Sequence, residues 1–205
     1  ATYGEWWQGA VKDCAHLVGV PLGTGFGGGF IENGRILRGA SCSAGEIGHM
    51  TIDFTGRRCA CGNYGCLEAY ASGPNIAARA KEGLEAGDAS ILSELVDGDL
   101  DALTAATVFE ALVRGDVYAQ GVMTETARIL GTGLANLVNC LNPERIVIVG
   151  GVTRAGEHLF GPLRSEVRRR AFPSAVEACV IVPGALPETA GVIGAAGIFA
   201  AERLD

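Results

Sequence analysis

Three cysteines and one histidine close together in the chain are the feature that most constrains its fold. Cys59, Cys61 and Cys66 lie within eight residues, and His49 precedes the first of them by ten. Three thiolates and an imidazole suit a closed tetrahedral zinc site with sulfur and nitrogen donors. Glycines between the cysteines permit the turns that wrapping a chain round one ion requires. The sequence therefore predicts structural Zn²⁺ held by His49, Cys59, Cys61 and Cys66.

Disulfide bonds and thiol chemistry are the alternatives to a metal site. The chain has seven cysteines, an odd number, and Cys59 and Cys61 are too close in sequence to bridge each other easily. No second histidine lies nearby in sequence to activate a catalytic thiol. Zinc binding is the favoured interpretation, and a disulfide bond and a reactive thiol remain as alternatives. The cysteines outside the cluster are expected to be small buried hydrophobic residues: Cys14, Cys42, Cys140 and Cys179.

The composition describes an acidic, globular chain. Its 205 residues, 48% of them hydrophobic, suffice for one full domain. A formal charge of −7 argues against nucleic acid as a partner of this chain, because phosphate binding needs a basic surface. No apolar run reaches membrane-spanning length, so no membrane is expected as a partner. Free thiols beside a zinc set favour a reducing compartment, and we expect the cytoplasm.

The order of predicted elements is typical of an α/β fold. Residues 15–38 read as an antiparallel meander, because Asn33-Gly34 between apolar runs is a strong hairpin signal. Residues 39–73 hold the zinc cluster, residues 74–142 are rich in helical patterns, and residues 143–205 alternate strands and helices. The opening aromatic stretch reads as the middle of a helix without an N-cap, so we expect the chain to begin partway into a larger protein.

Individual helices and strands can be predicted in the second half. The longest helix is expected over residues 117–141, with apolar residues repeating on one face. The β-branched runs at 145–149 and 179–182 predict two buried parallel strands. Further helices are predicted over residues 153–171 and 189–203.

Two glycine-rich turns could bind an anion or a nucleotide. Gly23, Thr24 and Gly25 lie between two predicted strands, where glycine lets backbone N–H groups approach a phosphate. Gly150 and Gly151 follow a buried strand at its carboxyl end, the edge where open α/β sheets bind ligands. A tight hairpin without ligand, and close helix–strand packing, are the alternatives for the two turns.

Two carboxylates flank the predicted metal ligands. Glu46 lies three residues before His49, and Glu68 lies two residues after Cys66. Carboxylates accept hydrogen bonds from vicinal sugar hydroxyls, and a metal-bound histidine can offer its other ring nitrogen outward. Glu46, His49 and Glu68 therefore form a candidate hydroxyl-binding set. The alternative is that both glutamates support the metal ligands or are simply exposed charges.

The quoted residues resemble a known signature. Gly45-Glu46-Ile-Gly-His49, followed by Cys59-x-Cys61-Gly-x-x-Gly-Cys66-x-Glu68, is similar to the motif of the ROK family of repressors and sugar kinases, and most similar to its bacterial glucokinases. The resemblance implies an actin-like, ribonuclease-H-type α/β fold and ATP-dependent phosphorylation of a hexose, with Mg²⁺. Residues 1–205 would form the C-terminal lobe of such a kinase, a homodimer or homotetramer.

The resemblance also assigns roles to residues. Glu46, His49 and Glu68 match the family's sugar ligands, so His49 would serve both zinc and sugar. The residues that match its nucleotide contacts lie in the two glycine-rich turns: Gly23, Thr24 and Gly25 in the second phosphate loop, and Gly150 and Gly151 at the adenosine. The sugar itself stays open among glucose, N-acetylmannosamine, N-acetylglucosamine and fructose.

The chain departs from the family pattern in two motifs. The first phosphate loop, Asp-x-Gly-Gly-Thr, does not occur in it, and neither does the Asn-Asp-x-Asn stretch that carries the catalytic base. Loss of a general base costs about 10²–10⁴-fold in rate. We therefore assign no catalytic residue and expect the chain alone to bind zinc and ligands without useful turnover. A sugar-responsive repressor body and a non-catalytic assembly lobe are the alternative functions.

Overall fold

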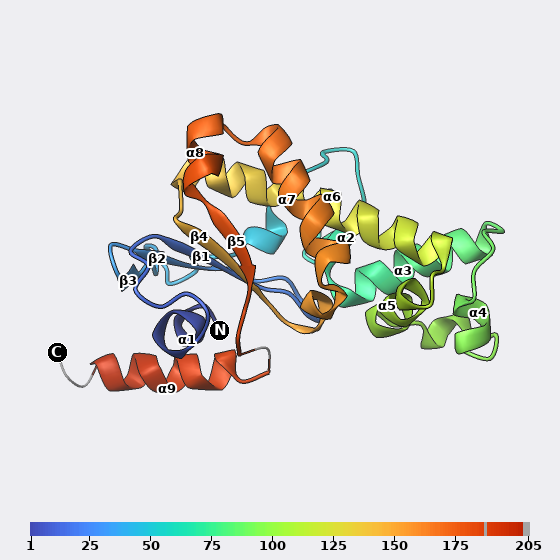
Figure 1. Ribbon diagram of the computed structural model, residues 1–205, viewed down its shortest axis with the longest axis horizontal. Coiled ribbons are helices and arrows are strands. Elements are labelled where there is room, and N and C mark those ends of the chain that lie inside the picture. Colours follow the sequence, from blue (N-terminus) through green and yellow to red (C-terminus); the bar gives the residue numbers. More distant parts are fainter. Residues whose placement is uncertain (187, 203–205) are drawn as a thin grey trace.

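A five-stranded mixed sheet forms the centre of the molecule (Figure 1). The computed structural model describes residues 1–186 and 188–202. The strands follow the order β3-β2-β1-β4-β5, antiparallel between β3, β2 and β1 and parallel between β1, β4 and β5. Their bounds are β1 (Leu17–Pro21), β2 (Gly29–Glu32), β3 (Arg35–Ile36), β4 (Arg145–Val149) and β5 (Val180–Pro183). The predicted meander and the predicted parallel strand at 145–149 are both confirmed.

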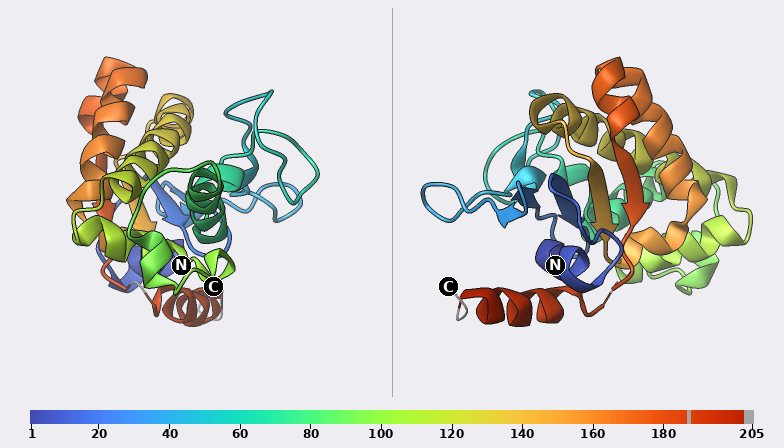
Figure 2. Two further views of the ribbon diagram at one scale, coloured as in Figure 1. Left: turned by 90° about the vertical axis from the view of Figure 1, so that its right-hand side faces the viewer. Right: turned by 60° about the vertical axis from the view of Figure 1, so that its left-hand side comes forward.

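Helices cover both faces of the sheet and extend beyond one end of it (Figures 1 and 2). The α-helices are α1 (Thr2–Gln8), α2 (Glu68–Ala71), α3 (Gly73–Glu85), α4 (Leu92–Leu95), α5 (Ala105–Val113), α6 (Val117–Leu141), α7 (Glu157–Arg170), α8 (Pro173–Ala178) and α9 (Ala190–Glu202). Short 3₁₀ turns are η1 (Ile47–His49), η2 (Leu100–Ala102) and η3 (Gly151–Ala155). Among the described residues, no helix is both long and apolar enough to cross a membrane.

The two faces of the sheet belong to separate apolar layers. Successive side chains of a strand point to opposite faces, so neighbouring residues enter different cores. Val18, Ile146 and Ile148 join the large core beneath α6 and α7. Leu17 and Val147 join a smaller core closed by α1, against which α9 packs. The sheet is thus covered on both sides, as its parallel half requires.

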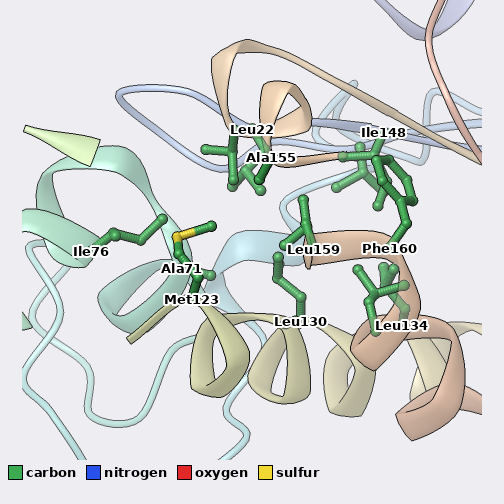
Figure 3. Packing of buried hydrophobic residues seen from close by; sticks show 14 of the residues in the cluster. Leu22, Ala71, Ile76, Met123, Leu130, Leu134, Ile148, Ala155, Leu159 and Phe160 are labelled. Atoms are coloured by element: carbon green, nitrogen blue, oxygen red, sulfur yellow. The ribbon is translucent and has the colours of Figure 1, made fainter. Parts of the chain in front are cut away.

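The large core is built on α6, which has the bounds the sequence predicts. Its N-cap Asp116 accepts a hydrogen bond from the backbone N–H of Ala119 at 2.7 Å, and Asn142 ends it with φ of 45°. Leu130 and Leu134 point toward α7, as the close view shows (Figure 3). This packing holds the helical half of the molecule against the strands that carry the glycine-rich turns.

A buried carboxylate fixes the first helix to the far end of the chain. Glu5 on α1 is fully buried. Its Oε2 accepts hydrogen bonds from the backbone N–H groups of Ala10 (2.8 Å) and Ala185 (3.0 Å), and its Oε1 accepts one from Leu186 (2.7 Å). Backbone donors compensate the burial of this group. This role could not be predicted from the sequence, because two of the three donors, Ala185 and Leu186, lie 180 and 181 residues away.

Several sequence expectations were wrong in detail. The helix predicted over residues 153–171 is divided into η3 and α7, because Gly156 between them has φ of +53° and interrupts helical geometry. Helix α8 forms in a stretch for which the sequence predicted no helix. Strand β5 is an edge strand rather than a buried one, with Val180 52% exposed. Cys42 and Cys140 are exposed rather than buried, although Cys14 is buried and Cys179 half-buried.

The end of α7 contains a charge cluster that makes stability depend on pH. Glu166 is only 8% exposed, and its carboxylate accepts hydrogen bonds from Arg169 and Arg170. These bonds lower the pKa of Glu166 from 4.5 to about 2. A lowered folded-state pKa contributes stability above the unfolded value and loses it as the pH falls toward the folded value.

We therefore expect Glu166→Gln to remove an acid-sensitive part of the stability. The native chain should lose about 1–2 kcal/mol more than the variant between pH 4.5 and pH 2, a modest effect because water screens the exposed arginines. Urea unfolding at several pH values measures the difference. The control is Glu157→Gln, which alters an exposed partner of Arg164 on the same helix. Parallel pH curves for native chain and Glu166→Gln would contradict the expectation.

Candidate functional site

The four predicted metal ligands come together in the structure. The donor atoms of His49, Cys59, Cys61 and Cys66 all lie within 4.8 Å of one another. Cys61 Sγ is 3.7 Å from Cys66 Sγ, and His49 Nδ1 is 3.8 Å from Cys59 Sγ. Four ligands at zinc–sulfur and zinc–nitrogen bond lengths would be about 3.6–3.8 Å apart along the edges of a tetrahedron. The donor set and its spacing therefore fit a Zn²⁺ ion.

Local turns bring these ligands together. Between η1 and α2 the chain forms two isolated bridges, Thr51 with Cys66 and Arg58 with Tyr64. Gly65 has φ of +69°, and a Cβ there would lie 1.6 Å from the carbonyl oxygen of Asp53. Only glycine fits this crossing of two backbone segments. The glycine next to Cys66 is therefore required by the geometry of the metal-binding loop.

The thiols differ in how readily they ionise. Burial, with hydrogen bonds to neighbouring thiols, raises the pKa of Cys66 to about 12. The backbone N–H of Asn63 leads the interactions that lower the pKa of the exposed Cys61. A cation in the cluster stabilises the thiolate of a buried cysteine at neutral pH. Zinc bound by the four donors would therefore favour the thiolate form of Cys66.

Glu46 and His49 form the open side of the cluster. His49 Nε2 lies 3.9 Å from Glu46 Oε2, while its Nδ1 is turned toward Cys59. The side chain of Glu46 is 70% exposed and that of His49 is 36% exposed. Behind them, the backbones of Gly45 and Gly28 touch, since a Cβ on Gly45 would lie 2.4 Å from the Gly28 carbonyl oxygen. Both side chains are thus accessible to a polar ligand.

Glu68, the third member of the predicted hydroxyl-binding set, has a different environment. It is half-buried at the start of α2. Its Oε2 accepts a hydrogen bond from the backbone N–H of Phe26 at 2.8 Å, and its Oε1 lies 4.0 Å from Cys59 Sγ. Glu68 therefore connects the metal cluster with the glycine-rich turn, a contact that the sequence analysis did not foresee.

The two glycine-rich turns meet at one pocket. A cavity of about 560 Å³ is lined by Gly23 and Thr24 from the first turn and Gly151 from the second. Gly25 and Gly150 are not among its lining residues. A Cβ on Gly25 would lie 3.5 Å from Glu68, and a Cβ on Gly150 only 2.1 Å from the Leu22 carbonyl oxygen. The structure thus brings together Thr24 and Gly151, 127 positions apart in the chain, which the family resemblance assigned to one nucleotide.

The remaining walls of this pocket are apolar and belong to helices. They come from α3, α5, the segment before α5, α6 and η3, and include Pro74, Ile76, Ala77, Leu103, Ala105, Phe109, Met123, Val152 and Ala155. Thr104 and Arg154 add polar groups at the lining. An apolar pocket with few polar groups is typical of small-molecule sites. The sequence did not predict that these residues line a pocket, because apolar positions on a helix predict burial in the hydrophobic core.

Comparison with known proteins identifies the family. The ROK family profile matches residues 1–202. This chain belongs to the ROK family. It is 42% identical over 196 residues to a glucokinase from Halalkalibacterium halodurans, covering 95% of this chain and 59% of the relative. It is also 32% identical over 203 residues to a xylose repressor from Caldicellulosiruptor bescii, covering 98% of this chain and 50% of that protein.

A solved ROK structure supports the same fold. The ROK family glucokinase from Streptomyces griseus, in complex with glucose and AMPPNP, matches with a TM-score of 0.87 and 34% identity. The match covers 96% of this chain and 64% of that structure. The chain therefore has the α/β fold of ROK sugar kinases and spans about 60% of the length of the glucokinases it matches.

Proposed function

We propose that this chain supplies the sugar-recognition part, and part of the ATP site, of a glucokinase-like hexose kinase. One observation carries the proposal: Gly23, Thr24 and Gly151 line the same pocket, and Glu68 links that pocket's turn to the sugar-binding candidates. Phosphoryl transfer depends on holding a nucleotide phosphate beside an acceptor hydroxyl. A carboxylate set next to a phosphate turn is the arrangement that such a reaction needs.

Within this proposal each group has a separate task. On the exposed side of the cluster, the Glu46 carboxylate accepts hydrogen bonds from sugar hydroxyls and the His49 ring N–H donates one. Glu68 contributes its carboxylate from the inner side. Backbone N–H groups of residues 23–25 bind phosphate, and the apolar helix residues hold the nucleoside. Zn²⁺ held by His49 and the three cysteines would fix the loop that carries the sugar ligands, and Mg²⁺ would accompany ATP. The catalytic base is not assigned to any residue of this chain.

The sugar assignment predicts a selective loss on mutation of Glu46. Replacing its carboxylate in Glu46→Gln removes a charged acceptor, so glucose binding should weaken about tenfold while AMPPNP binding stays unchanged. Calorimetric or NMR titration of the zinc-loaded chain with each ligand measures both constants. Glu177→Gln, an exposed glutamate on α8, is the matched control and should change neither. Equal glucose affinity of Glu46→Gln and native chain would exclude Glu46 from the sugar site.

A sugar-responsive repressor body is the second candidate function. The specific observation in its favour is the xylose repressor, whose match covers 98% of this chain. Such a body needs to bind a sugar but has no need of a nucleotide. Binding of AMPPNP in the 560 Å³ pocket therefore favours the kinase, and glucose binding without any AMPPNP binding favours the repressor.

A further inference from the structure

The glycine-rich turn has few internal contacts to fix its position. Leu22 and Phe26 form an isolated bridge at its base, and the backbone N–H of Gly23 donates to the carbonyl oxygen of Gly25 at 3.0 Å. Gly23, Thr24 and Gly25 at its tip are exposed. Two glycines and no buried side chain at the tip leave the turn with little intrinsic rigidity. Its geometry therefore depends on the groups that hold Gly23 and Phe26 from outside.

The metal-binding segment, residues 48–73, supplies three of these contacts. Glu68 Oε2 accepts the N–H of Phe26 at 2.8 Å, and the N–H of Gly73, just beyond α2, donates to the carbonyl oxygen of Gly23 at 2.8 Å. Gly48, next to His49, packs so closely that a Cβ there would lie 2.2 Å from the carbonyl oxygen of Phe26. Both sides of the metal cluster thus touch the turn.

Glu68 is the direct connection between the cluster and the turn. Its second oxygen, Oε1, lies 4.0 Å from Cys59 Sγ. The segment between η1 and α2 has only two isolated bridges as regular structure. Its two ends are joined by backbone hydrogen bonds, from the Leu67 N–H to the Met50 carbonyl oxygen (3.0 Å) and from the Ile52 N–H to the Gly65 carbonyl oxygen (2.8 Å). Its position relative to the turn depends on these bonds and on whatever joins His49 to the cysteines. Four ligands bound to one ion would fix that relation.

We propose that the metal-binding segment positions the glycine-rich turn through Glu68, so that zinc supports nucleotide binding as well as sugar binding. Loading the cluster fixes Cys59 and Glu68, and Glu68 holds the N–H of Phe26 at the base of the turn. Glu68 is in this respect a positioning residue for the phosphate turn. The inference deepens the proposed function and rests on it only for the assignment of the turn to nucleotide phosphates.

Hydrogen exchange of the whole 205-residue chain tests this connection without any sugar, nucleotide or turnover. Peptides covering residues 22–27 are compared in the zinc-loaded chain, the chelator-treated chain and zinc-loaded Glu68→Ala. Loss of the charge-assisted bond should raise exchange of the Phe26 amide about tenfold in the last two samples. Glu68→Gln keeps an acceptor oxygen and should restore most of the protection. Strand β4 is the internal control and should stay protected in every sample.

The outcomes separate this inference from the proposed function. Unchanged exchange at residues 22–27 in zinc-loaded Glu68→Ala overturns the connection. Equal loss of protection in residues 22–27 and in β4 also overturns it, because the effect is then global unfolding. If Glu68→Ala does not fold, exchange in the native chain is compared with and without zinc. The connection is then overturned if removing zinc leaves exchange at residues 22–27 unchanged, or if it reduces protection equally in residues 22–27 and in β4. If native chain shows the coupled protection but binds no AMPPNP, the connection holds and the kinase assignment fails.

Discussion

Cys66→Ser is expected to empty the metal cluster and to cause the largest loss of stability among single substitutions at the site. Cys66 is fully buried, and its sulfur is one of four donors within 4.8 Å of one another. Removing one thiolate from a structural zinc site sacrifices much of the folding free energy that the ion contributes. Zinc should fall from one ion per chain to near zero, and the melting temperature should fall by about 10 °C.

Metal analysis of chelator-free protein and thermal unfolding measure the two effects. Cys140→Ser is the matched control, since Cys140 is exposed and lies outside the cluster. It should keep the full zinc content and shift the melting temperature by no more than about 2 °C. A native chain with far less than one zinc per chain, or a Cys66→Ser variant as stable as the control, would refute a structural zinc site.

Gly150→Ala is expected to destabilise the chain by about 3–5 kcal/mol. Gly150 has φ of +114°, where an L side chain is strained, and a Cβ there would lie 2.1 Å from the carbonyl oxygen of Leu22. The same junction contains the hydrogen bond from the Leu22 N–H to the Val149 carbonyl oxygen at 2.8 Å. Accommodating a methyl group requires β1 and β4 to separate where both glycine-rich turns begin. Urea unfolding measures the loss.

The neighbouring glycine provides the control for this substitution. A Cβ on Gly151 would meet no atom of the described residues within 4 Å, and its φ lies outside the left-handed range. Gly151→Ala should therefore change the unfolding free energy by no more than about 0.5 kcal/mol. Similar stability losses in the two variants would mean that the contact between Gly150 and Leu22 does not account for the effect.

The cluster of one histidine and three cysteines could be predicted from the sequence because its ligand set is local. His49 and the three cysteines lie within 18 residues, and their residue types and glycine spacing define a ligand set before any tertiary contact is known. The strands at 15–38 and 145–149 and the helix at 117–141 were predictable for a related reason. Their hydrophobic patterns and end signals are strong within each segment.

The features that escaped sequence analysis depend on long-range contacts. The carboxylate of Glu68 accepts a hydrogen bond from the backbone N–H of Phe26, 42 residues away, and no local sequence pattern predicts this contact. The walls of the 560 Å³ pocket are ordinary apolar helix residues such as Phe109 and Met123, whose sequence pattern predicts core positions. Strand β5 has the sequence of a buried strand but lies at the sheet edge. The position of a strand in the sheet order decides its exposure, and the strand's own sequence does not encode that position.

The carboxylate of Glu5 has a consequence for the order in which this chain can fold during synthesis. Its backbone partners at Ala185 and Leu186 are 180 and 181 residues downstream, so the ribosome makes α1 long before these partners exist. Contacts of such sequence separation form late, after the intervening elements have closed the loop. Tyr3 and Trp6 on α1 also pack against a cluster that includes Val147 and Val149 of β4, so this part of their cover is missing until β4 has been made.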